Sequence, residues 1–245
     1  MNMKRNKWRM ILDIARTELQ TLFYSPIAWL TLIIFVVQAS MTFSSVFGTY
    51  VERFNLGYRP VNLTQGIFSG FRGLYSSILP YLFYYFPLLT MGLMSRELSS
   101  GSVKLLYSSP VNNIQIILGK FVSMMIYALV FVGILLVFII FGACTIDHFD
   151  FWLTVSGLLG VYLLICSYAA IGLFMSSLTS YQIVAALGTL SILFVLNMVG
   201  GLWQDIEWVR DITWWLSISG RANEFISGLI CSEDVLYFVF VTGLF

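Results

Sequence analysis

Charge is scarce in this 245-residue chain: Asp, Glu, Lys and Arg make up 10% of its residues, whereas about 25% is usual for a soluble domain. Hydrophobic residues make up 59%. The apolar runs do not alternate with polar residues, and they approach the roughly 20 residues that a helix needs to cross about 30 Å of hydrocarbon. The sequence therefore predicts an integral membrane protein, an all-α, polytopic membrane helical bundle.

Motifs for chemistry are also missing. The formal net charge of +1 leaves no broad basic field, which argues against nucleic acid as a partner. The chain has no Gly-rich loop followed by Lys-Ser or Lys-Thr that could cradle ATP, and it has no HExxH or GxSxG pattern. We therefore expect no catalytic residues, no metal and no cofactor in this chain, and we do not expect it to be an enzyme.

Cysteine and histidine are few. None of the three cysteines belongs to a CxxC pair. Cys166 lies in the middle of an apolar segment and is interpreted as a packing residue, whereas Cys144 and Cys231 lie at segment ends, and a disulfide between them is left open. The only histidine, His148, lies in CTIDHFD. Its neighbours could be drawn as a metal site, but the spacing fits no ligand pattern, so a solvated turn is favoured.

Five complete apolar segments and one short one are present. The sixth begins at Val235 and runs to Phe245, and eleven helical residues cover only about half of a bilayer core. We predict six membrane-spanning helices, the last one truncated, in a natural chain that continues further. No complete segment contains an ionisable residue, which argues against an ion-coupled carrier. The predicted spans are 27–49, 74–94, 121–143, 151–176, 182–200 and 235–245.

Residues 4–23 precede the first span. Apolar residues, among them Trp8 and Ile11, recur there at helical spacing, while Arg16 falls on the polar side. This pattern predicts an amphipathic helix that lies in the membrane interface. The alternative is an ordinary positively charged N-terminal tail. The first apolar run is too long for a cleaved signal peptide, so we expect it to be the first membrane anchor.

The distribution of Lys and Arg predicts the orientation. With the N-terminus in the cytoplasm, eight of these residues lie inside and five outside, so the chain is predicted to be a multi-pass protein of the inner (cytoplasmic) membrane. The inner set is Lys4, Arg5, Lys7, Arg9, Arg16, Arg96, Lys104 and Lys120, and the outer set is Arg53, Arg59, Arg72, Arg210 and Arg221.

The outer segment 201–234 is too apolar for a free loop, and it contains four tryptophans that suit the headgroup level. We interpret it as one or two short helices that dip into the outer interface as a re-entrant region. A plain aromatic belt beside ordinary short helices is the alternative.

A polar stretch, SRELSSGSVKLLYSSPVNNIQIILGK, covers residues 95–120 on the predicted cytoplasmic side. Arg96 and Glu97 follow the second span at the level of the inner headgroups, and Gly101, with the two preceding serines, breaks the helix. Asn112 or Asn113 is the expected N-cap of the helix that leads into the third span.

The middle of this stretch predicts a short helical turn. Val103, Leu106 and Tyr107 share one face at spacings of three and four residues, and Lys104 lies away from it. Pro110 ends the turn. A short apolar face with a basic residue beside it suits docking into a groove of a cytoplasmic partner. The residues alone leave open that the stretch is merely a loop resting on lipid.

Three motifs, taken together, resemble the ABC transporter type-2 permeases. The first comprises Arg96-Glu97, Gly101-Ser102, Leu105-Leu106, Ser109-Pro110 and Gly119-Lys120, and resembles the family's intracellular coupling region. The second, GLFMSSLTSYQIVAA at 172–186, resembles the turn between the fourth and fifth spans. The third, ELQTLFYSPIAWL, begins at Glu18 and is similar to the interfacial helix of the gliding-motility-type branch. Ser102 stands where Thr is commoner in the family.

The resemblance implies a partner and a function. It implies a coupling helix at 98–109 that seats in a cytoplasmic ABC ATPase, two ATPase subunits that carry ATP and Mg, and a second permease subunit, identical or different. Substrate would leave along the dimer interface, lined by the first, second and fifth spans. The expected function is the permease subunit of an exporter. The alternative is a non-transporting membrane anchor or mechanotransmission subunit of an ATPase-driven envelope assembly.

Overall fold

The computed structural model describes residues 3–57, 62–102, 112–146, 148–199, 213, 217–229 and 231–245, with side chains from Trp8 onward. Every regular element in these ranges is a helix, which confirms the all-helical class for the described residues. The elements are α1 (Met3–Tyr24), α2 (Pro26–Asn55), the π-helix η1 (Gln65–Ser69), α3 (Leu74–Thr90), α4 (Ser95–Ser100), α6 (Asn113–Thr145), α7 (Phe151–Leu178), α8 (Gln182–Met198), α10 (Ile218–Ile226) and α11 (Ser232–Leu244).

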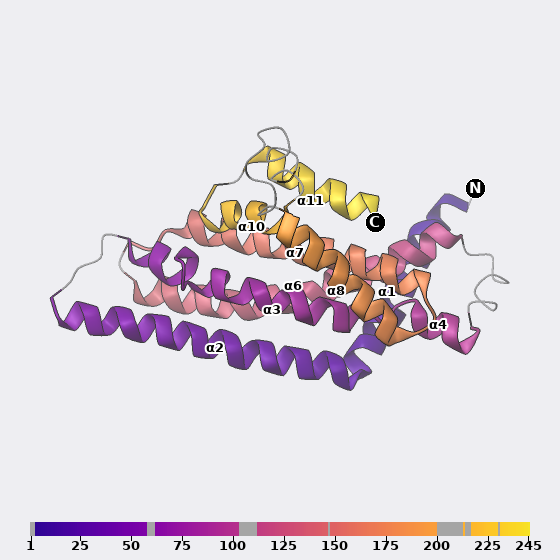
Figure 1. Ribbon diagram of the computed structural model, residues 1–245, viewed down its shortest axis with the longest axis horizontal. Coiled ribbons are helices and arrows are strands. Elements are labelled where there is room, and N and C mark those ends of the chain that lie inside the picture. Colours follow the sequence, from indigo (N-terminus) through magenta and orange to yellow (C-terminus); the bar gives the residue numbers. More distant parts are fainter. Residues whose placement is uncertain are drawn as a thin grey trace.

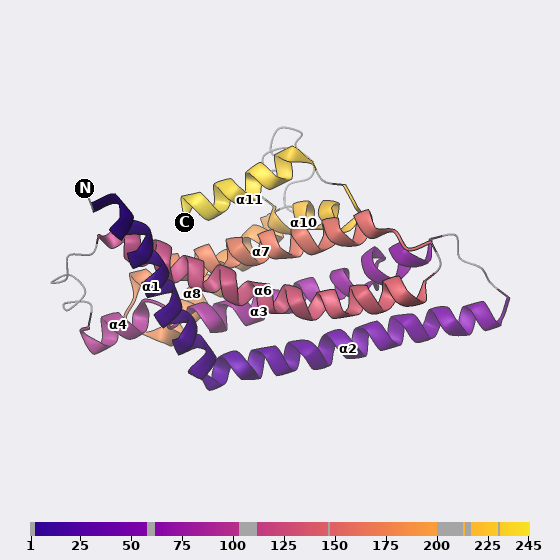
Figure 2. The same ribbon diagram turned by 180° about the vertical axis from the view of Figure 1, so that it is seen from behind.

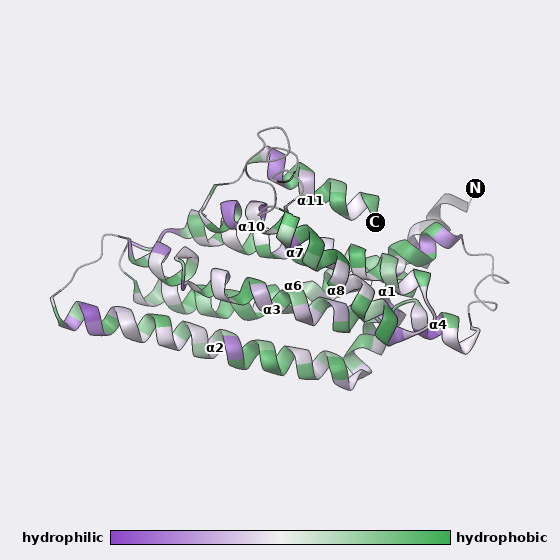
Figure 3. Ribbon diagram, in the orientation of Figure 1, coloured by the Kyte–Doolittle hydropathy of each residue, from purple (hydrophilic) through white to green (hydrophobic). Residues whose placement is uncertain are grey.

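Four helical stretches of the described chain are long and apolar enough to cross a membrane, and Figure 3 shows hydrophobic residues in green along them. They are Pro26–Asn55, Gln65–Ser100, Asn113–Thr145 and Phe151–Leu178. Helix α8 is apolar but has 17 residues, and α11 has 13. The protein is therefore a multi-pass membrane protein, while the count of six spans stays a prediction.

The long helices α2, α3, α6 and α7 run alongside one another, as Figures 1 and 2 show from opposite sides. Helix α1 lies across one end of this bundle, close to α4 and to the beginning of α6. Helices α10 and α11, at the C-terminal end of the chain, pack on α7. The fold thus places the N-terminal helix α1 and the described beginning of the predicted coupling region at the same end.

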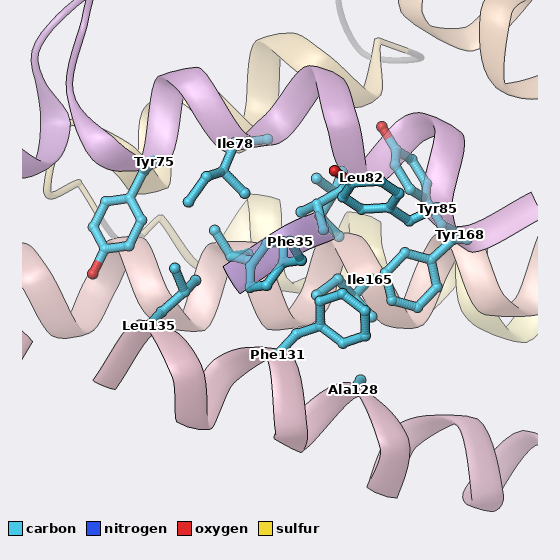
Figure 4. Packing of buried hydrophobic residues seen from close by; sticks show 14 of the residues in the cluster. Phe35, Tyr75, Ile78, Leu82, Tyr85, Ala128, Phe131, Leu135, Ile165 and Tyr168 are labelled. Carbon is cyan, nitrogen blue, oxygen red and sulfur yellow. The ribbon is translucent and has the colours of Figure 1, made fainter. Parts of the chain in front are cut away.

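Aromatic side chains fill the centre of the bundle. Phe131 of α6 meets Phe35 of α2 edge-on at 4.8 Å between ring centroids, and it also lies 5.5 Å from the ring of Phe86 on α3. Figure 4 shows these helices contributing to one cluster with Tyr85 and Ile165. In a membrane such van der Waals packing, rather than a hydrophobic drive, holds helices together.

Helix α2 is packed on one side. Its buried residues, among them Ala28, Phe35 and Phe43, recur at helical spacing on one face, while Ile33 and Val37 on other faces are exposed. Within the described chain, this apolar exposure has no protein partner to cover it. It suits contact with lipid or with another protein.

The predicted outer features have mixed outcomes. His148 is exposed and adopts a positive φ of 60°, which suits a turn. Cys144 and Cys231 are exposed free cysteines and Cys166 is a buried one, so the structure does not contain the disulfide that the sequence left open. Part of the predicted re-entrant region, including residues 201–212, lies outside the described residues, and its described part consists chiefly of α10, the turn after it and the start of α11.

Candidate functional site

A buried lysine joins three elements at one end of the bundle. The Lys120 ammonium of α6, 1% exposed, donates to Glu18 Oε1 of α1, to Glu97 Oε1 of α4 at 2.6 Å, and to the carbonyl of Leu93 at 2.7 Å. An ammonium group has three donors, and all three are used here. We call this set, with its Lys120, Glu18 and Glu97 side chains, the Lys120 cluster.

The cluster is an ion-pair network in a mostly dry place. The carboxylates of Glu18 and Glu97 are 19% and 23% exposed, so water reaches them only in part. Glu97 Oε2 has no hydrogen-bond partner among the described residues. A buried charge is costly without its counter-ion, so the ammonium and the two carboxylates hold their helices together.

Close packing of α1 against α6 makes the cluster possible. Gly119 lies beside Lys120, and a Cβ added to Gly119 would stand 2.7 Å from Cγ2 of Ile14 and 3.2 Å from the carbonyl of Ile11. The missing side chain therefore lets the two helices approach. Ile11 and Ala15 are buried on α1, about two turns and one turn before Glu18.

A serine of α7 fixes the break between α3 and α4. The N–H groups of Met94 and Ser95 donate to Ser176 Oγ at 3.0 and 3.1 Å, and the Ser176 hydroxyl donates to the carbonyl of Met91 at 3.0 Å. These backbone groups lie where the chain leaves the helical pattern, so they need outside partners. Ser176 is fully buried and thereby binds the α3–α4 break to α7.

Helix α4 carries the start of the predicted coupling region. It begins at Ser95, three residues before the predicted coupling helix, and it ends at Gly101, whose φ of 72° is left-handed. Glycine adopts this conformation without strain. Residues 98–100 are therefore the last turn of α4, and residues 103–111 lie outside the described residues.

The structure brings together only some of the predicted site residues. Arg96 is exposed on α4 beside Glu97, and Arg16 is exposed on α1. Trp8 is 74% exposed, whereas Ile11 packs inward, so the two do not share one environment. The remaining predicted coupling residues, which lie outside the described part, are Val103, Lys104, Leu106, Tyr107 and Pro110.

The sequence identifies Lys120 as an inner cation and as part of the Gly119-Lys120 motif pair, but it reveals no partner for it. The structure places it as the eighth residue of α6 and buries it, so it does not extend toward the headgroups. The local signal was the Gly119-Lys120 pair, since a glycine permits a close helix approach and a buried lysine needs an acid. Which acids would meet it could not be read from spacing, because Glu18 is 102 residues away.

The fold and the cluster define a polytopic α-helical membrane protein without a nucleotide-binding motif. An ion-pair network joins its N-terminal helix α1 to α4 and α6. A model of the family described as ABC-2 family transporter protein matches residues 12–206. The chain belongs to this family, and it is a membrane permease component of an ABC transporter. Comparison with the curated proteins finds no match. The family resemblance is thereby confirmed, and the gliding-motility-type branch stays a prediction.

Proposed function

We propose that the chain is the non-catalytic permease subunit of an ATP-driven exporter, paired with a second permease subunit and served by two cytoplasmic ATPase subunits. The Lys120 cluster is the observation that carries the proposal. It joins the N-terminal helix α1, the α3–α4 break with helix α4, and the long helix α6. ATP and Mg would bind to the ATPase subunits.

The cluster gives a direct route for force. A force on residues 103–111 would pass along the chain to α4. From α4 it would pass through the Lys120 cluster to α1 and α6, and from the adjacent break through Ser176 to α7. Buried ion pairs and hydrogen bonds resist separation, so these helix ends would shift together as a rigid body. Closure of two ATPase subunits would then move the spans that border the export path.

Docking of the ATPase is tested with a double variant. We expect a tagged chain, purified from its native membrane, to carry vanadate-sensitive ATPase activity, and the variant Leu106→Asp, Tyr107→Asp to lose it, because the apolar docking face would carry charge. The matched control is Phe71→Asp, since Phe71 is 97% exposed before the N-terminal end of α3, whereas α4 follows the C-terminal end of that helix. Equal ATPase recovery with the double variant and the control would overturn the docking proposal.

Transport is tested after reconstitution into vesicles. Solute movement that requires ATP supports the exporter. An ATPase that cycles with the complex while no solute moves across a broad panel would support the mechanotransmission subunit instead. Transport that continues without the ATPase and stops when the proton gradient collapses would refute both proposals.

The orientation is tested with the natural cysteines. With the N-terminus in the cytoplasm, Cys144 and Cys231 face the outside and both are exposed, whereas Cys166 is 5% exposed. We expect a membrane-impermeant maleimide to label Cys144 and Cys231 in intact cells and to leave Cys166 unlabelled until the protein is unfolded. Labelling of the first two cysteines only after the cells are opened would show the reverse orientation.

A further inference from the structure

A second charged cluster lies between α10 and α11, beyond the residues that the family model matches. Glu224 belongs to the last turns of α10, Cys231 is the N-cap residue of α11, and Asp234 belongs to the first turn of α11. One potential ligand atom from each of these three residues lies within 4.8 Å of the other two. Their burial increases from the exposed Cys231 through the half-buried Glu224 to the buried Asp234.

The turn between the two helices builds this arrangement. The N–H of Gly228 donates to the Phe225 carbonyl at 3.0 Å and the N–H of Leu229 donates to the Glu224 carbonyl at 3.2 Å, which is a Schellman motif. Gly228 has a φ of 89°, which only glycine adopts readily. The motif turns the chain back so that Glu224 faces the start of α11.

The spacing of the other two residues follows from the helix end. Cys231 at the N-cap and Asp234 three residues later occupy the positions whose side chains face each other across the first turn of a helix. The Cys231 side chain makes no capping hydrogen bond, so its sulfur is available. Glu224, Cys231 and Asp234 therefore face one another because of backbone geometry.

Asp234 supplies the independent observation that points to a ligand. Its side chain is 1% exposed, and Arg221 Nη1 donates to its Oδ1 at 2.5 Å. The other oxygen, Oδ2, is buried and has no hydrogen-bond partner among the described residues. An anionic oxygen in a dry place needs a partner, and an ion pair on Oδ1 leaves Oδ2 free to bind a cation.

We propose that Glu224, Cys231 and Asp234 bind a zinc ion at the predicted outer face, with Arg221 as a positioning residue. Sulfur together with carboxylate oxygen suits Zn²⁺, whereas Ca²⁺ and Mg²⁺ prefer oxygen alone and more ligands. Three protein ligands leave a fourth position for water, and the exposed side of the cluster gives access to it.

Charge and size both fit this ion. A divalent cation, three anionic ligands and the Arg221 guanidinium sum to zero, which suits a partly buried site. Ligand atoms around a tetrahedral zinc lie about 3.5 Å apart. The present separations, all within 4.8 Å, must therefore shrink by up to about 1.3 Å. The exposed Cys231 and the half-buried Glu224 can make this adjustment while Asp234 stays fixed by Arg221.

Glu224 and Asp234 are two carboxylates on successive helices, and one oxygen of each lies within 4.8 Å of the other. Two carboxylates that face each other gain most when a cation lies between them. The spacing of Glu224, Cys231 and Asp234 in the sequence matches no known ligand pattern. The sequence therefore offers no reason to expect a metal in this chain.

The experiment uses the full chain in detergent micelles, with Zn²⁺ and Cd²⁺ as probes. We expect one zinc per chain after dialysis at micromolar zinc, and an ultraviolet charge-transfer band on titration with Cd²⁺, which reports a thiolate ligand. Cys231→Ser should abolish the band. Cys231→Ser and Glu224→Gln should each lower zinc affinity at least about tenfold. Serine is a better N-cap than cysteine, so the first variant should fold.

Matched controls separate this site from general surface binding. Cys144→Ser removes an exposed cysteine elsewhere, and Glu233→Gln removes an exposed acid next to Asp234. Both should keep the cadmium band and change zinc affinity less than about threefold, since neither supplies a ligand. Three results would overturn the proposal. They are a cadmium band that remains in Cys231→Ser, an equal loss of zinc affinity in the controls, and a zinc content of the wild type at background.

Discussion

Replacement of Lys120 by methionine removes the only cation of the Lys120 cluster while keeping a long apolar side chain. Glu18 and Glu97 then face each other without a counter-ion. Breaking a fully buried ion pair costs about 3–5 kcal/mol, whereas an exposed pair contributes about 0–1 kcal/mol. Because the two carboxylates are 19% and 23% exposed, water relieves part of their repulsion. We therefore expect the low end of the buried range, about 3 kcal/mol, or roughly a hundredfold change in the unfolding equilibrium.

The assay is reversible unfolding of the purified chain in mixed micelles, followed by circular dichroism. The triple variant Glu18→Gln, Glu97→Gln, Lys120→Met removes all three charges and should recover more than half of the loss, since an apolar or neutral replacement of a whole buried ion network is often tolerated. A loss below about 1 kcal/mol for Lys120→Met, or a triple variant as unstable as the single one, would refute the reasoning. A small loss would mean that water solvates the ions, and a triple variant without recovery would mean that the loss does not come from the unpaired carboxylates.

Two further predictions concern the helix contacts beside the cluster. Gly119→Ala should destabilise the chain by about 1–3 kcal/mol, because the new Cβ meets α1, whereas Gly133→Ala, in open space on the same helix, should be neutral or slightly stabilising in the same unfolding assay. Ser176→Ala should lower the free energy of unfolding by about 1–3 kcal/mol and increase amide hydrogen exchange at the α3–α4 break. The control, Ser177→Ala, changes an exposed neighbour and should have neither effect. Equal effects of the two variants would contradict the assigned role of Ser176.

Helix positions follow largely from apolar runs, because the part of a helix that crosses the hydrocarbon is apolar. Helix α7 covers Phe151–Leu178 where the sequence predicts 151–176. Helix α2 continues to Asn55, beyond the predicted 49, because the polar residues after the apolar run keep the helical hydrogen bonds, such as that from the Leu56 N–H to the Glu52 carbonyl at 3.1 Å. Polarity ends a predicted span, but it does not end a helix.

The sites were less predictable than the helices. Glu18 and Glu97 were named as functional residues on separate elements, but the ion that joins them is fixed by the approach of α1 to α6, which depends on Gly119 and Ile14. The role of Ser176 arises from orphan backbone groups at a break, and composition does not reveal where these groups lie. Long-range pairing of this kind is a property of packing, so a periodicity pattern carries no trace of it.

The distribution of strong and weak contacts indicates where the bundle can change shape. At the end that holds α1 and α4, the Lys120 cluster and Ser176 fasten α1, α4, α6 and α7 to one another. Helix α2 is packed on one face only, and large apolar residues on its other faces, such as Ile33 and Val37, are exposed. Under the proposed function, a stroke delivered at α4 would therefore displace the fastened ends together, and α2 would slide or separate, since packed elements move as units past their weaker neighbours.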